Sequence, residues 1–135
     1  MAPDQINRAE VLAQVRIAFE RYEAALRAHD DAALDRFFWD DARVLRYGVA
    51  EQARGADAVR RSRAAMTPVH PERELRDTQI TTFGTDSASV CTEFVAPDSS
   101  LLGRQTQTWV RFAGNWKIVA AHVSLVDPQT IRRYC

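Results

Sequence analysis

The sequence has few cysteines, a single lysine and no long hydrophobic run. Its two cysteines, Cys91 and Cys135, form neither a disulfide framework nor the spacing of a metal site. The longest apolar stretch is far too short to span a membrane, and the N-terminus lacks the charged and then apolar pattern of a signal peptide. We therefore expect a cytoplasmic protein with no membrane segment.

The chain also has no excess of charge of either sign. Its 18 Lys and Arg residues balance its 18 Asp and Glu residues, so the formal net charge is zero. This balance argues against nucleic acid or a membrane surface as a general partner. A local cationic site remains open, because every basic residue except Lys117 is an arginine. The histidines, His29, His70 and His122, fall in separate predicted elements, so we expect no metal site and no cofactor.

Length and periodicity predict one domain over residues 1–135. Hydrophobic residues make up 46% of the chain, enough for a single core. Apolar residues three and four apart predict a long helix over 7–29, with a capping box from Asn7 to Glu10. The remaining predicted elements are helices over 31–38 and 56–66 and strands over 42–47, 72–83, 87–95, 101–112 and 116–126.

The order of these elements predicts an α+β fold. Hairpins join the later strands, so the sheet should be largely antiparallel. We expect a curved sheet that wraps around the long N-terminal helix as a cone with one open end.

The final strand is the longest nearly unbroken apolar run. Counting by twos puts alternate residues on one face: Trp116, Ile118, Ala120, His122 and Ser124. If this face points into the cone, His122 and Ser124 line a cavity. The opposite face is mainly apolar: Lys117, Val119, Ala121, Val123 and Leu125. That face would meet water unless a second copy covered it, which predicts a homodimer through the outer sheet face.

Two polar residues occupy positions where burial is expected. Tyr22 lies within the apolar stripe of the long helix, and Arg46 shares a strand face with Val44. A buried phenol needs a hydrogen-bond partner, and a buried guanidinium must be paired or face a site. Each also has a structural interpretation: Tyr22 as a core residue bonded to a carbonyl, and Arg46 in water at a strand end.

Other residues are candidates for binding a ligand. Arg63 is predicted to lean inward from its helix, and Trp39 can form a cavity wall. One strand face carries Gln105, Gln107 and Trp109. If that face is concave, these side chains line the cavity, and if it is convex, they belong to a subunit interface.

The sequence offers two candidate nucleophiles, Cys91 and Ser124, and we expect neither to act as one. Cys91 is taken as a small core residue and not a reactive thiol. His122 and Ser124 do not form a nucleophile and base pair by sequence, because no acid is evidently placed to orient the histidine. We expect them to bind ligand or to make structural hydrogen bonds.

The element order resembles the cone of the nuclear transport factor 2-like, or SnoaL-like, superfamily, a cystatin-like roll. The stretch from Gly114 to Ser124 is similar to the closing strand of that superfamily. More narrowly, residues 103–112 and 116–125, with 54–59 and Arg63, resemble the AtzH-like family. That family includes the HpxZ proteins of oxalurate catabolism and the AtzH enzyme of cyanuric acid breakdown.

The resemblance implies a cofactor-free enzyme of ureide or s-triazine nitrogen catabolism, a C–N hydrolase or decarboxylase. It implies conversion of 1,3-dicarboxyurea to allophanate, with catalysis by Tyr22 and Arg46. Arg46 can clamp a carboxylate of a small anionic substrate through paired hydrogen bonds. Tyr22 can protonate a leaving nitrogen or donate to an oxyanion, and Arg46 would lower the pKa of its phenol.

Two alternatives remain. A non-catalytic small-acid binder or accessory protein of oxalurate or ureide catabolism would use the same tyrosine and arginine. An isomerase or dehydratase would need an acidic base at a buried strand position, and no aspartate occupies one.

Overall fold

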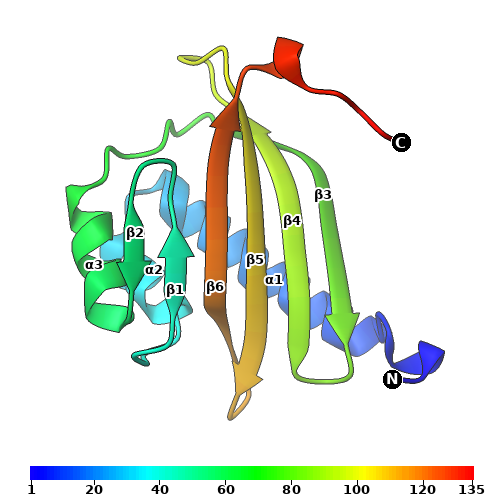
Figure 1. Cartoon of the computed structure of the whole chain (residues 1–135). Coiled ribbons are helices and arrows are strands. Elements are labelled where there is room, and N and C mark those ends of the chain that lie inside the picture. Colours follow the sequence, from blue (N-terminus) through cyan, green and yellow to red (C-terminus); the bar gives the residue numbers. More distant parts are fainter.

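The computed structural model describes all 135 residues, as three α-helices packed on a six-stranded sheet (Figure 1). The helices are α1 (Ala9–Arg27), α2 (Asp31–Phe37) and α3 (Ala56–Ala65). The strands are β1 (Leu45–Tyr47), β2 (Gln52–Arg54), β3 (Glu74–Phe83), β4 (Ser87–Val95), β5 (Leu102–Phe112) and β6 (Asn115–Val126). The predicted α+β class is confirmed, and β2 is a short strand that periodicity did not indicate.

The sheet has the strand order β2-β1-β6-β5-β4-β3. Neighbouring strands are antiparallel except β1 and β6, which run parallel. Helix α1 crosses one face of the sheet, with α2 and α3 beside it near β1 and β2, and no helix covers the other face (Figure 1). No helix of the chain is long and apolar enough to cross a membrane.

The core lies between α1 and the concave face of the sheet. The apolar stripe of α1 is buried as predicted, with Val11, Val15, Phe19, Tyr22 and Ala25 all facing inward. From the sheet, Trp109 and Ile118 are fully buried against this helix layer. The burial of apolar area by these side chains is the main contribution to stability.

The predicted capping box is wrong. Helix α1 begins after Arg8, whose side chain makes no capping hydrogen bond. Asn7 instead adopts a left-handed conformation (φ 54°), and its Oδ1 accepts a hydrogen bond of 2.8 Å from the backbone N–H of Thr82. The asparagine therefore fastens the N-terminal segment to β3. The second helix does have the predicted kind of cap, since Asp30 accepts from the backbone N–H of Ala33.

A β-bulge interrupts β6. Thr108 of β5 pairs with Ala120, but the next residue, Trp109, pairs with Ile118, which leaves Val119 as an extra residue on β6. One extra residue reverses the alternation of side chains along the rest of the strand. Trp116 and Ile118 face the helices before the bulge, and Ala121 faces them after it.

This bulge corrects two predictions. His122 is exposed and lies with Ser124 on the outer face of the sheet, not in the cone. Ala121 is buried, and Val123 and Leu125 line a cavity on the inner side. The apolar strip expected to form the outer face therefore belongs, beyond the bulge, to the interior.

Candidate functional site

The open end of the cone holds a cavity of about 630 Å³. Its walls come from α1, α3, the β1–β2 hairpin, the segment before β3, and the inner face of β4, β5 and β6. The polar residues that line it are Tyr22, Arg46, Glu51, Ser62, Arg63, Thr67, Arg73 and Gln105. Three guanidinium groups therefore face this space with one carboxylate, so the cavity is suited to anions.

Tyr22 projects from α1 into this cavity and is only 6% exposed. Its ring stacks on Phe37 at 5.9 Å between centroids and meets Phe38 and Trp109 at 6.2 Å. No protein group hydrogen-bonds to its hydroxyl, so the interpretation of a core tyrosine bonded to a carbonyl is wrong. The hydroxyl is left available for a ligand.

The pKa of Tyr22 is raised above its ordinary value of 10.0. Burial is the largest cause and the negative charge of Glu23 is the next, and together they outweigh the opposing charges of Arg63, Arg46 and Arg73. The predicted lowering by Arg46 is therefore wrong as a net effect. The side chain is a neutral phenol at physiological pH and can act as a proton donor.

Arg46 reaches the cavity from β1. The parallel pairing of β1 and β6 sets it opposite Ala121, with its side chain on the buried face. It is 8% exposed, so the interpretation of a solvated strand end is wrong. Its Nη1 lies 3.0 Å from Oε1 of Glu51, which follows the β1–β2 turn. This contact engages one nitrogen of the guanidinium and leaves other donors available.

Arg63 leans inward from α3 as predicted. Its Nε donates to Oδ1 of Asp35 at 3.0 Å, and its guanidinium lies over the ring of Phe38 at 4.9 Å from the centroid. Its Nη2 is buried and has no hydrogen-bond partner. The side chain is thus held in place while one terminal nitrogen stays unsatisfied.

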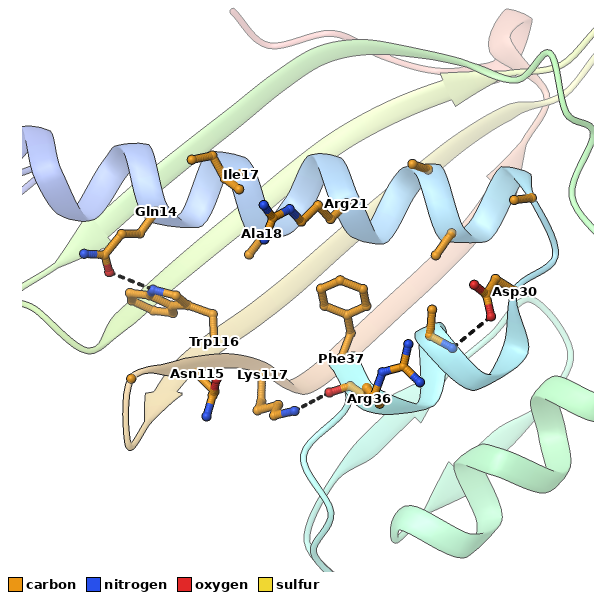
Figure 2. A pocket seen from close by; sticks show the side chains of 15 residues that line it. Gln14, Ile17, Ala18, Arg21, Asp30, Arg36, Phe37, Asn115, Trp116 and Lys117 are labelled. Atoms are coloured by element: carbon orange, nitrogen blue, oxygen red, sulfur yellow. Dashed lines mark hydrogen bonds between the residues drawn. The ribbon is translucent and has the colours of Figure 1, made fainter.

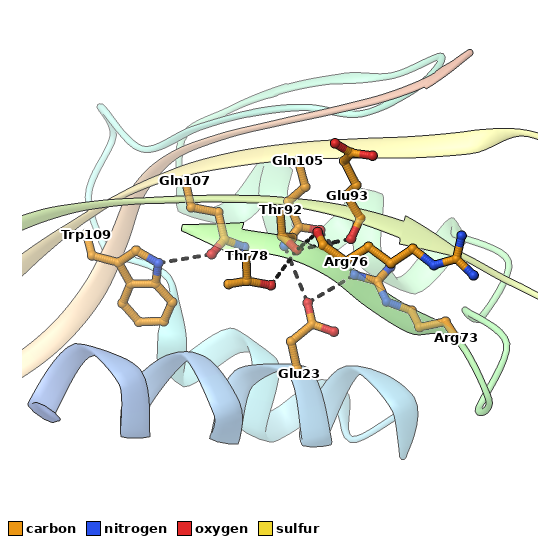
Figure 3. A network of polar contacts seen from close by, with 9 residues as sticks. All are labelled: Glu23, Arg73, Arg76, Thr78, Thr92, Glu93, Gln105, Gln107 and Trp109. Atoms are coloured by element: carbon orange, nitrogen blue, oxygen red, sulfur yellow. Dashed lines mark hydrogen bonds and ion pairs between the residues drawn. The ribbon is translucent and has the colours of Figure 1, made fainter. Parts of the chain in front are cut away.

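A third buried arginine, Arg73, lines the cavity and is held in a network of polar contacts (Figure 3). Arg73 lies in the segment before β3, and its Nη2 donates to Oε1 of Glu23 at 3.0 Å and to Oε1 of Gln105 at 3.2 Å. The amide of Gln105 also donates to Glu23, at 3.4 Å. The guanidinium of Arg73 lies 4.1 Å from the ring centroid of Phe94. Nε of Arg73 and Oε2 of Glu23 are buried without partners.

Sequence reasoning did not identify Glu23 or Arg73 as site residues. A signal existed for Glu23, because it continues the four-residue spacing of Val15 and Phe19 and so had to be buried. A buried carboxylate implies a cationic partner. Arg73 had no such signal, because the predicted strand over 72–83 has no clear alternation, and the structure begins β3 only at Glu74.

The strand face shared by Gln105, Gln107 and Trp109 is the concave one, and all three side chains are buried. Only Gln105 lines the cavity. Nε1 of Trp109 donates to Oε1 of Gln107 at 2.9 Å, within the core (Figure 3). Trp109 also packs against the ring of Tyr22, and neither Gln107 nor Trp109 lines the cavity as a binding residue.

Three further predicted positions lie away from the cavity. Trp39 stacks on Phe112 at 5.3 Å and lines a separate hollow. His122 packs edge-on against Tyr47 on the outer sheet face, at 5.6 Å. Cys91 is exposed on that face, so its assignment to the core is wrong. No three His, Cys, Asp or Glu side chains are grouped so that they could hold a metal ion.

A larger hollow of about 840 Å³ lies between α1, α2 and the β5–β6 turn (Figure 2). Within it, Trp116 donates to Gln14 and Lys117 donates to the backbone carbonyl of Arg36, and its two guanidinium groups belong to the exposed residues Arg21 and Arg36. No unsatisfied buried side-chain atom faces it. The chemistry therefore points to the arginine-lined cavity as the candidate site.

Comparisons with known proteins agree with this fold. The family model described as AtzH-like matches residues 4–129. The chain is similar to a solved cystatin-like fold protein from Burkholderia xenovorans, at 48% identity and a TM-score of 0.87, over 90% of this chain and 95% of that one. A protein of unknown function from Pectobacterium atrosepticum is also 48% identical, with a TM-score of 0.90 over 93% and 98% of the two chains.

A more distant neighbour shares the fold alone. It is an NTF2-like protein of unknown function from Pseudomonas putida, 20% identical, with a TM-score of 0.69 over 83% of this chain and 84% of that one. Among the curated proteins, none matches the chain. The predicted NTF2-like and cystatin-like architecture is confirmed.

Proposed function

Because the chain belongs to the AtzH-like family, we propose that it is a cofactor-free enzyme that acts on a small carboxylated urea. The proposed reaction converts 1,3-dicarboxyurea to allophanate in ureide or s-triazine nitrogen catabolism, with Tyr22 and Arg46 as the catalytic residues. The observation that carries this proposal is the unpartnered, protonated phenol of Tyr22 in a cavity lined by three arginines.

The substrate has two carboxylates joined through a urea, and the cavity offers cations to both. Arg46 binds the anion through its free guanidinium donors and stabilises negative charge that moves toward the urea group. The bond between one nitrogen and its carboxylate carbon breaks, and the electron pair stays on that nitrogen. The phenol of Tyr22 gives its proton to the nitrogen, and carbon dioxide leaves. Solvent then returns a proton to the phenolate.

Hydrolysis is the variant in which water attacks the same carboxylate carbon. In that case bicarbonate leaves and the nitrogen again takes a proton. Both variants need a proton donor on Tyr22, and both end in allophanate. We assign the reaction to the cytoplasm, in line with the two free cysteines.

The test is a comparison of Tyr22→Phe with Tyr134→Phe, a control at an 88% exposed position. Allophanate formation from 1,3-dicarboxyurea is followed by 13C NMR, and binding of the inert five-carbon di-acid glutarate is followed by calorimetry. Tyr22→Phe should lose about a hundredfold or more in turnover while it keeps glutarate affinity. Equal turnover in Tyr22→Phe and Tyr134→Phe would refute the role of Tyr22, and no turnover in either protein, with glutarate still bound, would indicate a small-acid binder.

We also propose a homodimer through the outer sheet face. Because of the bulge in β6, the apolar strip that predicted this dimer faces the interior beyond Val119. The outer face is nevertheless covered by no helix (Figure 1). An open sheet face of this extent is a common surface for association. Sedimentation equilibrium at micromolar concentration should give twice the chain mass of 15.3 kDa. A single species at the monomer mass would contradict this arrangement.

A further inference from the structure

The cavity contains more cationic groups than one carboxylate needs. Arg46, Arg63 and Arg73 line it together, and their side chains are 9%, 6% and 4% exposed. Each is fixed by a carboxylate, but that contact uses one nitrogen of each guanidinium. A guanidinium has five N–H donors, so each arginine keeps donors for a ligand.

Two of these arginines have unsatisfied buried nitrogens. Nη2 of Arg63 and Nε of Arg73 have no partner in the protein. A buried charged donor without an acceptor is costly, and a bound oxyanion would remove that cost. No nitrogen of Arg46 is buried without a partner. Only Arg63 and Arg73 would therefore gain a missing hydrogen bond from a bound oxyanion.

Arg63 and Arg73 are also held rigidly. The first lies on Phe38 and is bonded to Asp35, and the second lies on Phe94 and is bonded to Glu23 and Gln105. Side chains fixed in this way bind an anion with little loss of conformational freedom. Contacts of this kind are typical of arginines in an anion-binding site, and surface arginines that move freely lack them.

Arg46 and the Arg73 network reach the cavity from different strands of the same sheet face. Arg46 is on β1 and Gln105, which holds Arg73, is on β5, with β6 between them. Two strand spacings amount to about 10 Å. An extended anion with a carboxylate at each end spans this separation between the strands, with one end at Arg46 and the other at the group formed by Gln105 and Arg73.

We propose that Arg73 and Arg63 bind a second carboxylate, the one retained in the product, and make the site select di-anions over mono-acids. The statement that this carboxylate is the one retained in the product rests on the proposed function. The preference for two carboxylates itself follows from the cavity and is measurable without turnover. Arg73 and Arg63 are then binding residues that set substrate choice, and Tyr22 and Arg46 act at the other carboxylate.

The experiment compares glutarate with valerate, which has the same chain length and one carboxylate, by titration calorimetry. The wild-type protein should bind glutarate at least about tenfold more tightly than valerate. Arg63→Gln should weaken glutarate binding about tenfold and change valerate binding less than about threefold. Arg104→Gln, at an exposed position on β5, is the control and should change neither affinity.

Arg73→Gln alone would leave Glu23 buried and unpaired, so the double variant Glu23→Gln/Arg73→Gln is used to keep the fold. It too should lose the preference for glutarate. Equal affinity of the wild type for the two acids, or an unchanged preference in both Arg63→Gln and the double variant, would overturn the proposal. If the variants lose the preference for glutarate but the wild type does not form allophanate, the second carboxylate site is upheld and the proposed reaction is refuted.

Discussion

Nη2 of Arg73 lies 3.0 Å from Oε1 of Glu23, and the two side chains are 4% and 1% exposed. Fifty positions separate these residues in the chain. The pair joins the central helix α1 to the segment that enters β3, and Gln105 of β5 binds both partners. The ion pair therefore belongs to the structure of the site as well as to its charge.

Breaking this pair should be costly to folding. Glu23→Ala leaves the guanidinium of Arg73 buried without its counter-charge, and we expect a loss of about 3–5 kcal/mol in the free energy of unfolding. Urea denaturation measures this quantity. Glu20→Ala, at an exposed position on the same helix, is the control and should change stability by less than about 0.5 kcal/mol. Equal, small losses in the two variants would show that the pair contributes little.

The raised pKa of Tyr22 predicts a loss of stability at alkaline pH. Below the ordinary phenol pKa of 10.0, the folded and unfolded states both keep the proton. Above it, the unfolded chain loses this proton while the folded chain retains it. The unfolded state is then favoured, so this contribution to stability is lost as pH rises through the folded pKa.

Tyr22→Phe removes the titrating group and supplies the reference for this effect. The stability of the wild type relative to Tyr22→Phe should fall by about 1 kcal/mol between pH 9 and pH 11, measured by urea denaturation. Tyr47 and Tyr134 are present in both proteins, so their titration cancels in the difference. A difference that stays constant or increases across this range would contradict the burial argument.

Much of the fold followed from periodicity. The stripe on α1 predicted the burial of Tyr22, and the alternation of Val44 and Arg46 predicted an inward arginine. Side chains buried within one regular element leave a repeating signal in the sequence. The resemblance of residues 103–112 and 116–125 to the AtzH-like family then gave the family that the comparison confirmed.

The remaining features depend on contacts between distant parts of the chain. The bulge at Val119 lies in a stretch that is apolar on both faces, so the sequence was equally compatible with either alternation beyond it. Arg73 owes its burial to Glu23 and Gln105, not to its neighbours in sequence. Periodicity contains no information of this kind.

The bulge can be tested with two adjacent residues that face opposite sides. Leu125 lines the arginine cavity, and Ser124 lies on the outer face beside Arg104. Leu125→Asp places a carboxylate at the cavity, where it competes with an anionic ligand for the arginines. We expect glutarate affinity, measured by calorimetry, to fall about tenfold.

Ser124→Asp introduces the same charge one residue earlier, and it should leave glutarate affinity within about twofold, because the sheet lies between the new carboxylate and the cavity. Both positions retain some exposure, and Leu125 is 40% exposed, so both variants should fold. Circular dichroism confirms that before the titration. If the side chains of β6 alternated from Trp116 without a bulge, Ser124 would face the cavity. Ser124→Asp would then bind glutarate more weakly than Leu125→Asp. A stronger effect at Ser124 than at Leu125 would therefore refute the bulge and return His122 to the cavity.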